Sequence, residues 1–454
     1  MMNRRKFLKA SAGFAVMGLA MPRVGFAQQT LQAVRGSLNA EEFGIRPGAA
    51  ENQGKAFAAM LERASAENLP IFLPPGIYTL SDIDLPARVR LFGVSGATRL
   101  VNGGGALLRG RETEHIALTG IVLDGAGNGL ADGVKALLDL RGVRALAIDG
   151  CEIVDSASSA VALERAAGRI EHTAITRAAD VGIYSIDAAG LLIDANTVTD
   201  CDNGGILVHR TRPAPDGTRV TNNRIARIRA TFGGTGQHGN GINTYQAHEV
   251  AITGNHVSDC AFSAIRSNGG SNAVITGNHC LRSGETALYS EFSYEGAVIG
   301  SNIVDGAANG ISMVNFNEGG RMAACTGNIV RNLSRTGPYE KDAPGFGTGI
   351  AAEADTTVIG NVIENAPVWG IEIGWGPFVR NVIASGNVIR RAGTGIAVSV
   401  VEGGGAATIT DNIIEAARDG AIVGHRWAEP VTGDLALRDN PGFPHLTVAR
   451  NRVS

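Results

Sequence analysis

One pentapeptide occurs twice in this chain, and its spacing limits the folds that the chain can adopt. Ile-Thr-Gly-Asn-His runs from Ile252 to His256 and again from Ile275 to His279, 23 residues later. A looser pattern, a polar residue followed two places later by an apolar one, recurs about every 26 residues at Cys151, Thr173, Asn196, Asn223, Asn255, Asn278, Asn302, Asn328, Asn361, Asn387 and Asn412. A fixed period in this range is typical of a solenoid.

Each repeat also carries a small residue before an aliphatic one, as in Gly241-Ile242 and Ala264-Ile265. Short segments alternate apolar and polar residues, and no repeat holds ten residues of helical periodicity. Three short strands and three bends fit the length of one repeat. The sequence therefore predicts an all-β, single-stranded parallel β-helix of about eleven coils.

The recurring asparagine has a physical explanation in such a fold. Successive coils stack about 4.8 Å apart, so equivalent side chains lie directly above one another. An amide at the same bend of each coil can donate to one neighbour and accept from the other. We expect Asn278 to stack between Asn255 and Asn302, and His256 and His279 to be neighbours with a structural rather than a metal-binding role.

The segment before the repeats has a different character. Residues 52–66 form the one convincing amphipathic helix, with Phe57, Met60, Leu61 and Ala64 on a single stripe. A β-helix has an open apolar end, and this helix is expected to cover it. The expected divisions are a leader (1–27), an N-terminal cap with the first coils (28–110), the β-helix repeats (111–425) and a C-terminal cap (426–454).

The leader has the features of an export signal. Arg4 and Arg5 are followed by Lys-Phe-Leu-Lys, a weakly apolar segment and the small-residue site Gly25-Phe26-Ala27. This pattern predicts a twin-arginine signal, with the translocon as a transient partner and a periplasmic or secreted product. After the leader no stretch of 18 apolar residues occurs, so we expect no membrane span in the mature chain.

Net charge and cysteine count limit the partners and the covalent links that the chain is expected to have. The net charge of −3 is close to balance, which argues against a nucleic-acid partner. The five cysteines are odd in number and each lies in a different repeat. They are therefore expected to be small buried hydrophobes rather than a disulfide framework.

Two family resemblances accompany these patterns. FGIRPGA, the helix and IFLPPGIYTL, within residues 40–110, resemble the opening of pectate-lyase-like and polygalacturonase-like proteins. GNGIN, CAFSAIRSN, ALYSEFSYEGAV, NFNEGGRM, AAEADTTVIGN and GWGPFVRNV resemble a family of twin-arginine-translocated repeat proteins. These resemblances imply a right-handed β-helix and an exported location. The second family's repeat has been associated with cofactor binding, but the resemblance names no cofactor.

One outward face is richer in functional side chains than a solvated face requires. If the aliphatic residue points inward, the residues one and three places later point outward. Coil by coil these are Leu207 and His209, Asn243 and Tyr245, Arg266 and Asn268, Tyr289 and Glu291, Ser312 and Val314, Ala351 and Glu353, and then Glu372. Two long connections, Arg224–Asn240 and Val330–Thr348, are expected to project beside this face and to wall a pocket.

The pocket suggests a saccharide site, because rings can stack on sugars while polar groups bind hydroxyls and carboxylates. The candidate catalytic residues are Arg266, Tyr289, Glu291 and Tyr245. The candidate substrate-binding residues are His209, His238, Asn243, Asn268, Glu353, Glu372 and Trp375. No metal site is predicted.

Several functions remain open. A lyase acting on an acidic polysaccharide would use Arg266 to neutralise the uronate, Tyr245 or Tyr289 as the base, and His209 or His238 in support. A glycoside hydrolase would use Glu291 and Glu353, two coils or about 9.6 Å apart. A binding protein needs only the shape. The last alternative is a non-catalytic repeat protein that carries a metal or organic cofactor and is exported folded.

Overall fold

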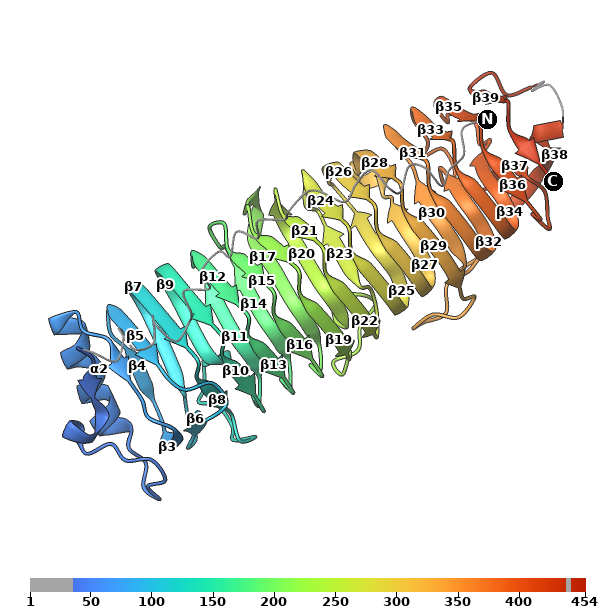
Figure 1. Ribbon diagram of the computed structural model, residues 1–454. Helices are drawn as coiled ribbons and strands as arrows, with labels where there is room; N and C mark the ends of the chain where they lie inside the picture. The colour runs from blue at the N-terminus through green and yellow to red at the C-terminus, as the bar shows by residue number, and fades with distance from the viewer. Residues whose placement is uncertain (1–35, 438–441) are drawn as a thin grey trace, which may run out of the picture.

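The chain winds into one long solenoid of stacked β-coils (Figure 1). The structure, a computed structural model, describes residues 36–437 and 442–454. The predicted leader, residues 1–27, lies outside this described part. Among the helices that can be described, none is long and apolar enough to cross a membrane.

The solenoid has about fourteen coils rather than the eleven expected. Thirteen parallel pairings join fourteen aliphatic residues into one inward column, from Ile83 to Ile422. The coils at Ile83, Leu108 and Leu138 were not among the eleven counted, because they lack the repeating asparagine and Gly-Ile landmarks. The fold class itself is confirmed.

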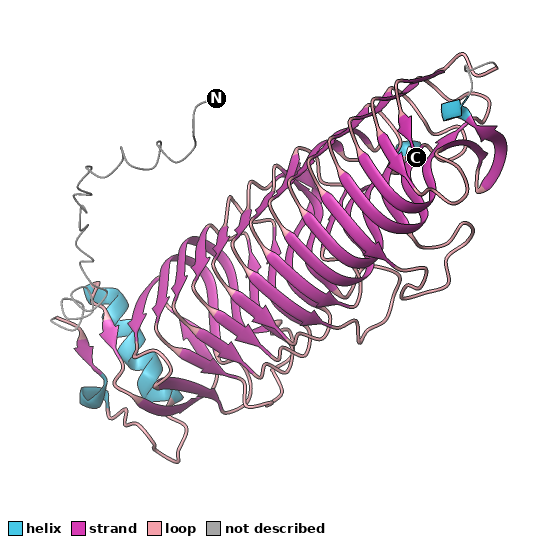
Figure 2. Cartoon of the chain, turned by 45° about the vertical axis from the view of Figure 1, so that its right-hand side comes forward, coloured by secondary structure: helices cyan, strands magenta, loops and turns pink. Residues whose placement is uncertain are grey.

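Three parallel faces run along the solenoid, and Figure 2 shows their strands stacked coil upon coil. The first face holds β4 (Ile83–Leu85), β7 (Leu108–Thr119), β9 (Ala136–Asp149), β11 (Ser159–Glu164), β14 (Val181–Ile186), β17 (Gly204–Pro215), β20 (Asn240–His248), β23 (Ile265–Asn268), β25 (His279–Glu291), β27 (Ile303–Met313), β30 (Thr348–Ala352), β32 (Val362–Ile373), β34 (Val388–Ser399) and β37 (Ile422–Arg426).

The second face contains β1 (Leu38–Asn39), β2 (Ile71–Phe72), β5 (Arg88–Phe92), β12 (Gly168–Glu171), β15 (Leu192–Asp194), β18 (Arg219–Thr221), β21 (Ala251–Thr253), β24 (Ala273–Thr276), β26 (Glu295–Gly300), β28 (Arg321–Thr326), β31 (Thr356–Ile359), β33 (Val382–Ser385), β35 (Ala407–Thr410) and β39 (Leu446–Ala449). The third contains β3 (Gly76–Leu80), β6 (Thr98–Asn102), β8 (Val122–Asp124), β10 (Glu152–Val154), β13 (Ala174–Thr176), β16 (Thr197–Thr199), β19 (Arg224–Ile228), β22 (His256–Cys260), β29 (Ile329–Leu333), β36 (Ile413–Glu415) and β40 (Arg452–Val453). The long strands β7, β9, β25, β27, β32 and β34 turn a corner and serve two faces.

The ends of the solenoid depart from the repeat. Helix α2 (Gly54–Glu67) lies at the N-terminal end, two residues later than predicted, because the Asn52 side chain accepts from the Gly54 amide at 2.8 Å. Its predicted apolar stripe is buried in the same core as the first coils. At the other end β38 (Glu429–Asp434) pairs antiparallel with β37. Short 3-10 turns are η2 (Ala40–Phe43), η3 (Phe316–Glu318) and η4 (Leu435–Leu437).

The asparagine ladder is confirmed. The Asn255 amide nitrogen donates to Asn278 Oδ1 at 3.0 Å, and Asn278 donates in turn to Asn302 Oδ1 at 3.0 Å. Each oxygen also accepts the backbone N–H of the preceding asparagine, and each side-chain nitrogen donates a second bond to a backbone carbonyl. The amides are buried, so the ladder satisfies groups that would otherwise be costly inside the protein.

The ladder has one more member than the sequence period suggested. Asn412 donates to Asn451 Oδ1 at 2.9 Å, across a connection of 39 residues. The residue before each asparagine adopts a left-handed conformation, whether it is Gly277 (φ 66°) or Ser301 (φ 55°). Glycine is therefore favoured at this bend without being required.

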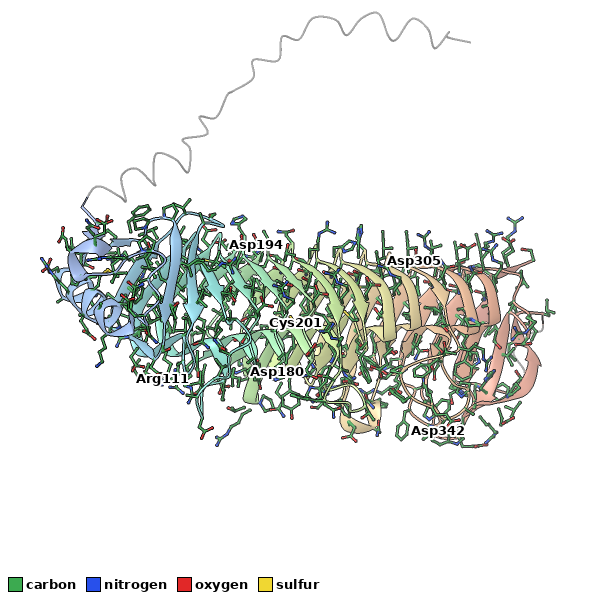
Figure 3. All side chains as sticks on the ribbon, turned by 90° about the horizontal axis from the view of Figure 1, so that it is seen from below. Arg111, Asp180, Asp194, Cys201, Asp305 and Asp342 are labelled. Atoms are coloured by element: carbon green, nitrogen blue, oxygen red, sulfur yellow. The ribbon has the colours of Figure 1, made fainter. Side chains whose placement is uncertain are left out.

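The cysteines behave as expected. All five are free and buried, and Cys201 lies inside the coils (Figure 3). Burial raises the pKa of the Cys201 thiol to about 12, which keeps it protonated and unreactive. His256 and His279 are neighbours in register on β22 and β25, with ring centroids 6.2 Å apart.

Candidate functional site

The outward register predicted for the first face is confirmed. Asn243 pairs with Arg266, Arg266 with Tyr289, and Tyr289 with Ser312 on successive coils. The column continues through Ala351 to Glu372. Equivalent side chains are therefore aligned along the axis, roughly one coil spacing of 4.8 Å apart.

Two cavities open on this face, one beside each insertion. The first, here the glutamate cavity, has a volume of about 430 Å³ and lies under residues 334–347. Its lining includes Tyr289, Ser312, Tyr339, Lys341, Glu353, Glu372 and Trp375. The second, the histidine cavity, has a volume of about 390 Å³ beside residues 229–239. Its lining includes His209, Gly236, Asn243, Tyr245, Arg266, Asn268 and Phe292.

The long insertion above the glutamate cavity is pinned by aromatic contacts. The Tyr339 ring stacks on Phe262 with centroids 6.4 Å apart and meets Phe346 edge-on at 5.4 Å. Its hydroxyl donates to Glu285 Oε1 at 2.6 Å. Asp342 in this insertion lies on the same side of the solenoid as Asp180 (Figure 3). Contacts within the chain thus hold this side of the cavity in place.

A buried ionic network separates the two cavities. Arg266 donates to both carboxylate oxygens of Glu291, at 2.5 and 3.0 Å, and to Glu285 at 3.3 Å. Only 12% of the Arg266 side chain and 5% of the Glu291 side chain are exposed. Burial alone would lower the pKa of Arg266, but the two carboxylates raise it. The guanidinium is therefore committed to protein partners, and its bidentate face is not open to a uronate.

Tyr289 lies against the other side of this network. The Arg266 guanidinium sits 5.0 Å from the centre of its ring, in cation–π geometry. Burial, with Glu285 nearby, raises the pKa of Tyr289 to about 12. The phenol is neutral near pH 7, which suits a stacking and hydrogen-bonding surface better than a base.

Glu353 is fixed by backbone donors. The Phe316 amide donates to Glu353 Oε2 at 2.6 Å, from the 3-10 turn η3. Only 9% of the residue is exposed. Burial raises the pKa of Glu353 to about 7, although the donated N–H bonds act in the opposite direction.

Glu372 lies one coil further on, at the floor of the same cavity. Part of its surface faces the cavity, and protein surrounds the rest. Burial raises the pKa of Glu372 to about 7, with Lys341 opposing the rise and Glu353 adding to it. Among the residues that the structure describes, none donates a hydrogen bond to this carboxyl. The cavity thus holds two coupled carboxyls that differ in hydrogen bonding.

Tryptophan continues the cavity toward the C-terminal end. Trp375 lines it and meets Trp427 edge-on, with centroids 5.5 Å apart. Trp427 follows β37 and is 47% exposed. Trp369 packs behind them, with its centroid 6.4 Å from that of Trp375. An exposed indole beside a polar cavity is a suitable surface for a sugar ring.

The sequence-predicted residues therefore divide between two cavities and the wall between them. Glu353, Glu372, Trp375 and Tyr289 reach the glutamate cavity, whereas His209, Asn243, Tyr245 and Asn268 reach the histidine cavity. Glu353 and Glu372 line the same cavity. Glu291, which the sequence suggested as the partner of Glu353, is instead bound to Arg266 and lines neither cavity. His238 rests against Phe232, with ring centroids 5.7 Å apart, and is not among the lining residues of either cavity.

Sequence reasoning missed three residues of this region. Glu285 belongs to the ionic network between the cavities, where it pairs with Arg266 and accepts a hydrogen bond from Tyr339. Lys341 lies close enough to Glu372 to interact with it electrostatically. Two of them lie in the second insertion, which was predicted to flank the face but could not be given side-chain positions. Within residues 36–437 and 442–454, no group of three or more His, Cys, Asp and Glu side chains is arranged to hold a metal ion.

Comparison with known proteins agrees with the architecture. The sequence matches the protein-family model described as the right-handed β-helix region, over residues 99–233 and 214–389. The chain belongs to this right-handed β-helix family. No curated protein matches its sequence.

Solved structures share the β-helix fold at low sequence identity. The N-terminal fragment of gene product 12 of bacteriophage Phi29 is 15% identical, with a TM-score of 0.59, covering 94% of this chain and 74% of that one. A PL6 alginate lyase in complex with a trisaccharide is 14% identical, with a TM-score of 0.50, covering 89% of this chain and 94% of that one. At these identities the likeness concerns the fold alone.

Proposed function

We propose that this β-helix protein binds a polysaccharide along its first face and hydrolyses a glycosidic bond in the glutamate cavity. The observation that carries the proposal is the pair Glu353 and Glu372, two electrostatically coupled carboxyls whose pKa burial raises to about 7, at the floor of a cavity lined by Tyr289 and Trp375. Glycoside hydrolysis requires two carboxyl groups that occupy different protonation states at the same pH.

The surroundings of the two glutamates suggest their roles. Glu372 receives no hydrogen bond from any residue that the structure describes and is the better candidate for the protonated acid, which gives its proton to the leaving oxygen. Glu353 accepts the Phe316 N–H, which favours its ionised form. The ionised carboxylate stabilises the positive charge that develops on the sugar ring, and it either attacks the anomeric carbon or activates a water.

Charge in the glutamate cavity favours a neutral saccharide. Its described lining residues include four acids, Glu340, Asp342, Glu353 and Glu372, and one cation, Lys341. A uronate would meet net repulsion there whenever the carboxyls are ionised. Arg266, the expected clamp for an acidic polysaccharide, is engaged by Glu291. Hydrolysis of a neutral polysaccharide therefore fits the site better than β-elimination of an acidic one.

The test uses the mature chain, a panel of neutral and acidic polysaccharides, and two simultaneous readouts. Hydrolysis generates new reducing ends without ultraviolet absorbance, whereas β-elimination generates an unsaturated product that absorbs. We expect reducing ends from a neutral polysaccharide and no absorbance change. Absorbance appearing on a uronate polymer would replace this proposal with a lyase, and binding without product would leave a binding protein.

We further infer that the protein acts in the periplasm or outside the cell, after export by the twin-arginine translocon. The support is the leader with Arg4 and Arg5, together with the resemblance to twin-arginine-translocated repeat proteins. Many polysaccharides are extracellular or cell-wall materials, which fits this location. The buried free cysteines need no oxidation in that compartment.

A further inference from the structure

The histidine cavity contains polar atoms that the protein leaves without partners. Asn243 is 6% exposed, and its Oδ1 has no hydrogen bond among the described residues. His209 Nε2 is likewise buried and without a partner. Both side chains line the same cavity. A buried polar atom of this kind costs free energy unless a ligand or water supplies its hydrogen bond.

Charge does not determine what this cavity binds. Arg266, the one cation among its described lining residues, is neutralised by Glu291 and Glu285. Burial lowers the pKa of His209 to about 4, so the imidazole is neutral at pH 7. A ligand here would therefore be recognised through hydroxyl groups rather than through a charge.

Aromatic rings complete the cavity. The His209 ring lies between Tyr184 and Tyr245, at 5.2 and 5.7 Å between centroids. Tyr245 is 42% exposed and Phe292 is 37% exposed, and both line the cavity. Exposed rings beside unpaired polar atoms match a saccharide, which offers apolar ring faces together with hydroxyl groups that both donate and accept.

The two cavities also lie on one line. Asn243, Arg266 and Tyr289 occupy successive coils of one column, and Glu372 belongs to the same column. Asn243 lines one cavity and Ala351 the other, and they are four coils apart, which is about 19 Å along the axis. A linear polymer laid along the face meets both cavities.

We propose that the histidine cavity is a second saccharide site, which binds a neutral segment of the same polymer and holds it while hydrolysis takes place in the glutamate cavity. This inference rests on the proposed function. The second site has no carboxylate pair of its own open to the ligand, because Glu291 is bound to Arg266. Its contribution is affinity and chain-length selectivity.

The test measures binding by calorimetry with neutral gluco-, xylo-, manno- and galacto-oligosaccharides, from disaccharide to octasaccharide. His209→Phe keeps the ring but removes Nε2, and Asn243→Leu keeps the volume but removes Oδ1. Each is made in the Glu372→Gln background to prevent turnover. His279→Phe, an exposed histidine on the third face, is the matched control. If melting falls in either variant, the exposed Tyr245→Ala replaces it.

We expect affinity for the longest oligosaccharide to fall about tenfold per variant, as for the loss of one hydrogen bond. Disaccharide hydrolysis by the His279→Phe control, made in the otherwise wild-type chain, should match wild type. Equal affinity in control and variants, or a wild type that binds no neutral oligosaccharide, overturns the inference. If the variants lose affinity but wild type releases no reducing ends, the second site stands and the hydrolytic proposal fails.

Discussion

Arg266 and Glu291 face each other on neighbouring coils, with Nε 2.5 Å from one carboxylate oxygen and Nη2 3.0 Å from the other. Both side chains are largely buried. Arg266 lines the histidine cavity, and Tyr289, which packs against its guanidinium, lines the glutamate cavity, so the pair lies between the two. We propose that its role is structural and that the chemistry belongs to groups on either side.

Arg266→Ala should therefore lower stability. Removing the guanidinium leaves Glu291 and Glu285 buried without their cation, a change that typically costs about 3–5 kcal/mol. The matched control is Arg282→Ala, because Arg282 binds Asp259 in the same two-bond geometry but is 61% exposed. Loss of the exposed pair should cost at most about 1 kcal/mol. If Arg266→Ala and Arg282→Ala lower the free energy of unfolding in urea by equal amounts, the buried pair does not stabilise the protein more than the exposed pair does.

Asn278→Ala should interrupt the ladder in the middle of the solenoid. It leaves the Asn255 amide and the Asn302 oxygen each without a bond that they make in the wild type. We expect a loss of about 1–3 kcal/mol. Asn317→Ala, at an exposed residue in η3, should change stability little. The comparison is made by thermal melting, and similar midpoints for the two variants would argue against the ladder.

The two glutamates should make stability depend on pH. In the unfolded chain they lose their protons near pH 4.5, whereas in the folded chain they keep them until about pH 7. Stability is therefore greatest below about pH 4.5 for this contribution and falls as the pH rises to 7. Glu353→Gln and Glu372→Gln should each be more stable than wild type at pH 8, on the order of 1–3 kcal/mol. A constant difference between pH 5 and pH 8 would contradict the raised pKa.

Replacing both Arg4 and Arg5 by lysine should block export. The twin-arginine route reads the paired guanidinium groups, so precursor should accumulate in the cytoplasm, and the mature wild-type chain should begin near Gln28. Fractionation followed by N-terminal sequencing provides the measurement. A double variant that reaches the periplasm at the wild-type level would argue for another route.

The fold could be predicted because its causes are local and repeated. The spacing of Asn255 and Asn278 sets the coil length, and the alternation around Ile242 sets which side chains face outward. Ile83 and Asn451 were missed for the same reason: the end coils do not repeat the landmarks on which the prediction depended.

The site was predicted less completely, because it depends on contacts between coils. The predicted outward register correctly aligned Arg266 with Tyr289. It could not show that Glu291 pairs with the Arg266 guanidinium. Tyr339 reaches Glu285 across 54 residues from an insertion that has no repeat to follow. Burial, which raises the pKa of Glu372, is a property of the assembled cavity and has no signature in the repeat.

The most direct test of the hydrolytic cavity is release of reducing ends from the neutral polysaccharide that wild type cleaves, by wild type, Glu372→Gln and Glu353→Gln. Loss of an acid or base in such a site typically lowers the rate about 10²–10⁴-fold. Binding should persist in both variants, and Glu62→Gln, on the distant helix α2, should match wild type. Wild-type activity should peak near pH 7, falling at lower pH as Glu353 is protonated and at higher pH as Glu372 loses its proton. If either glutamine variant keeps wild-type turnover, the two glutamates are not the catalytic pair.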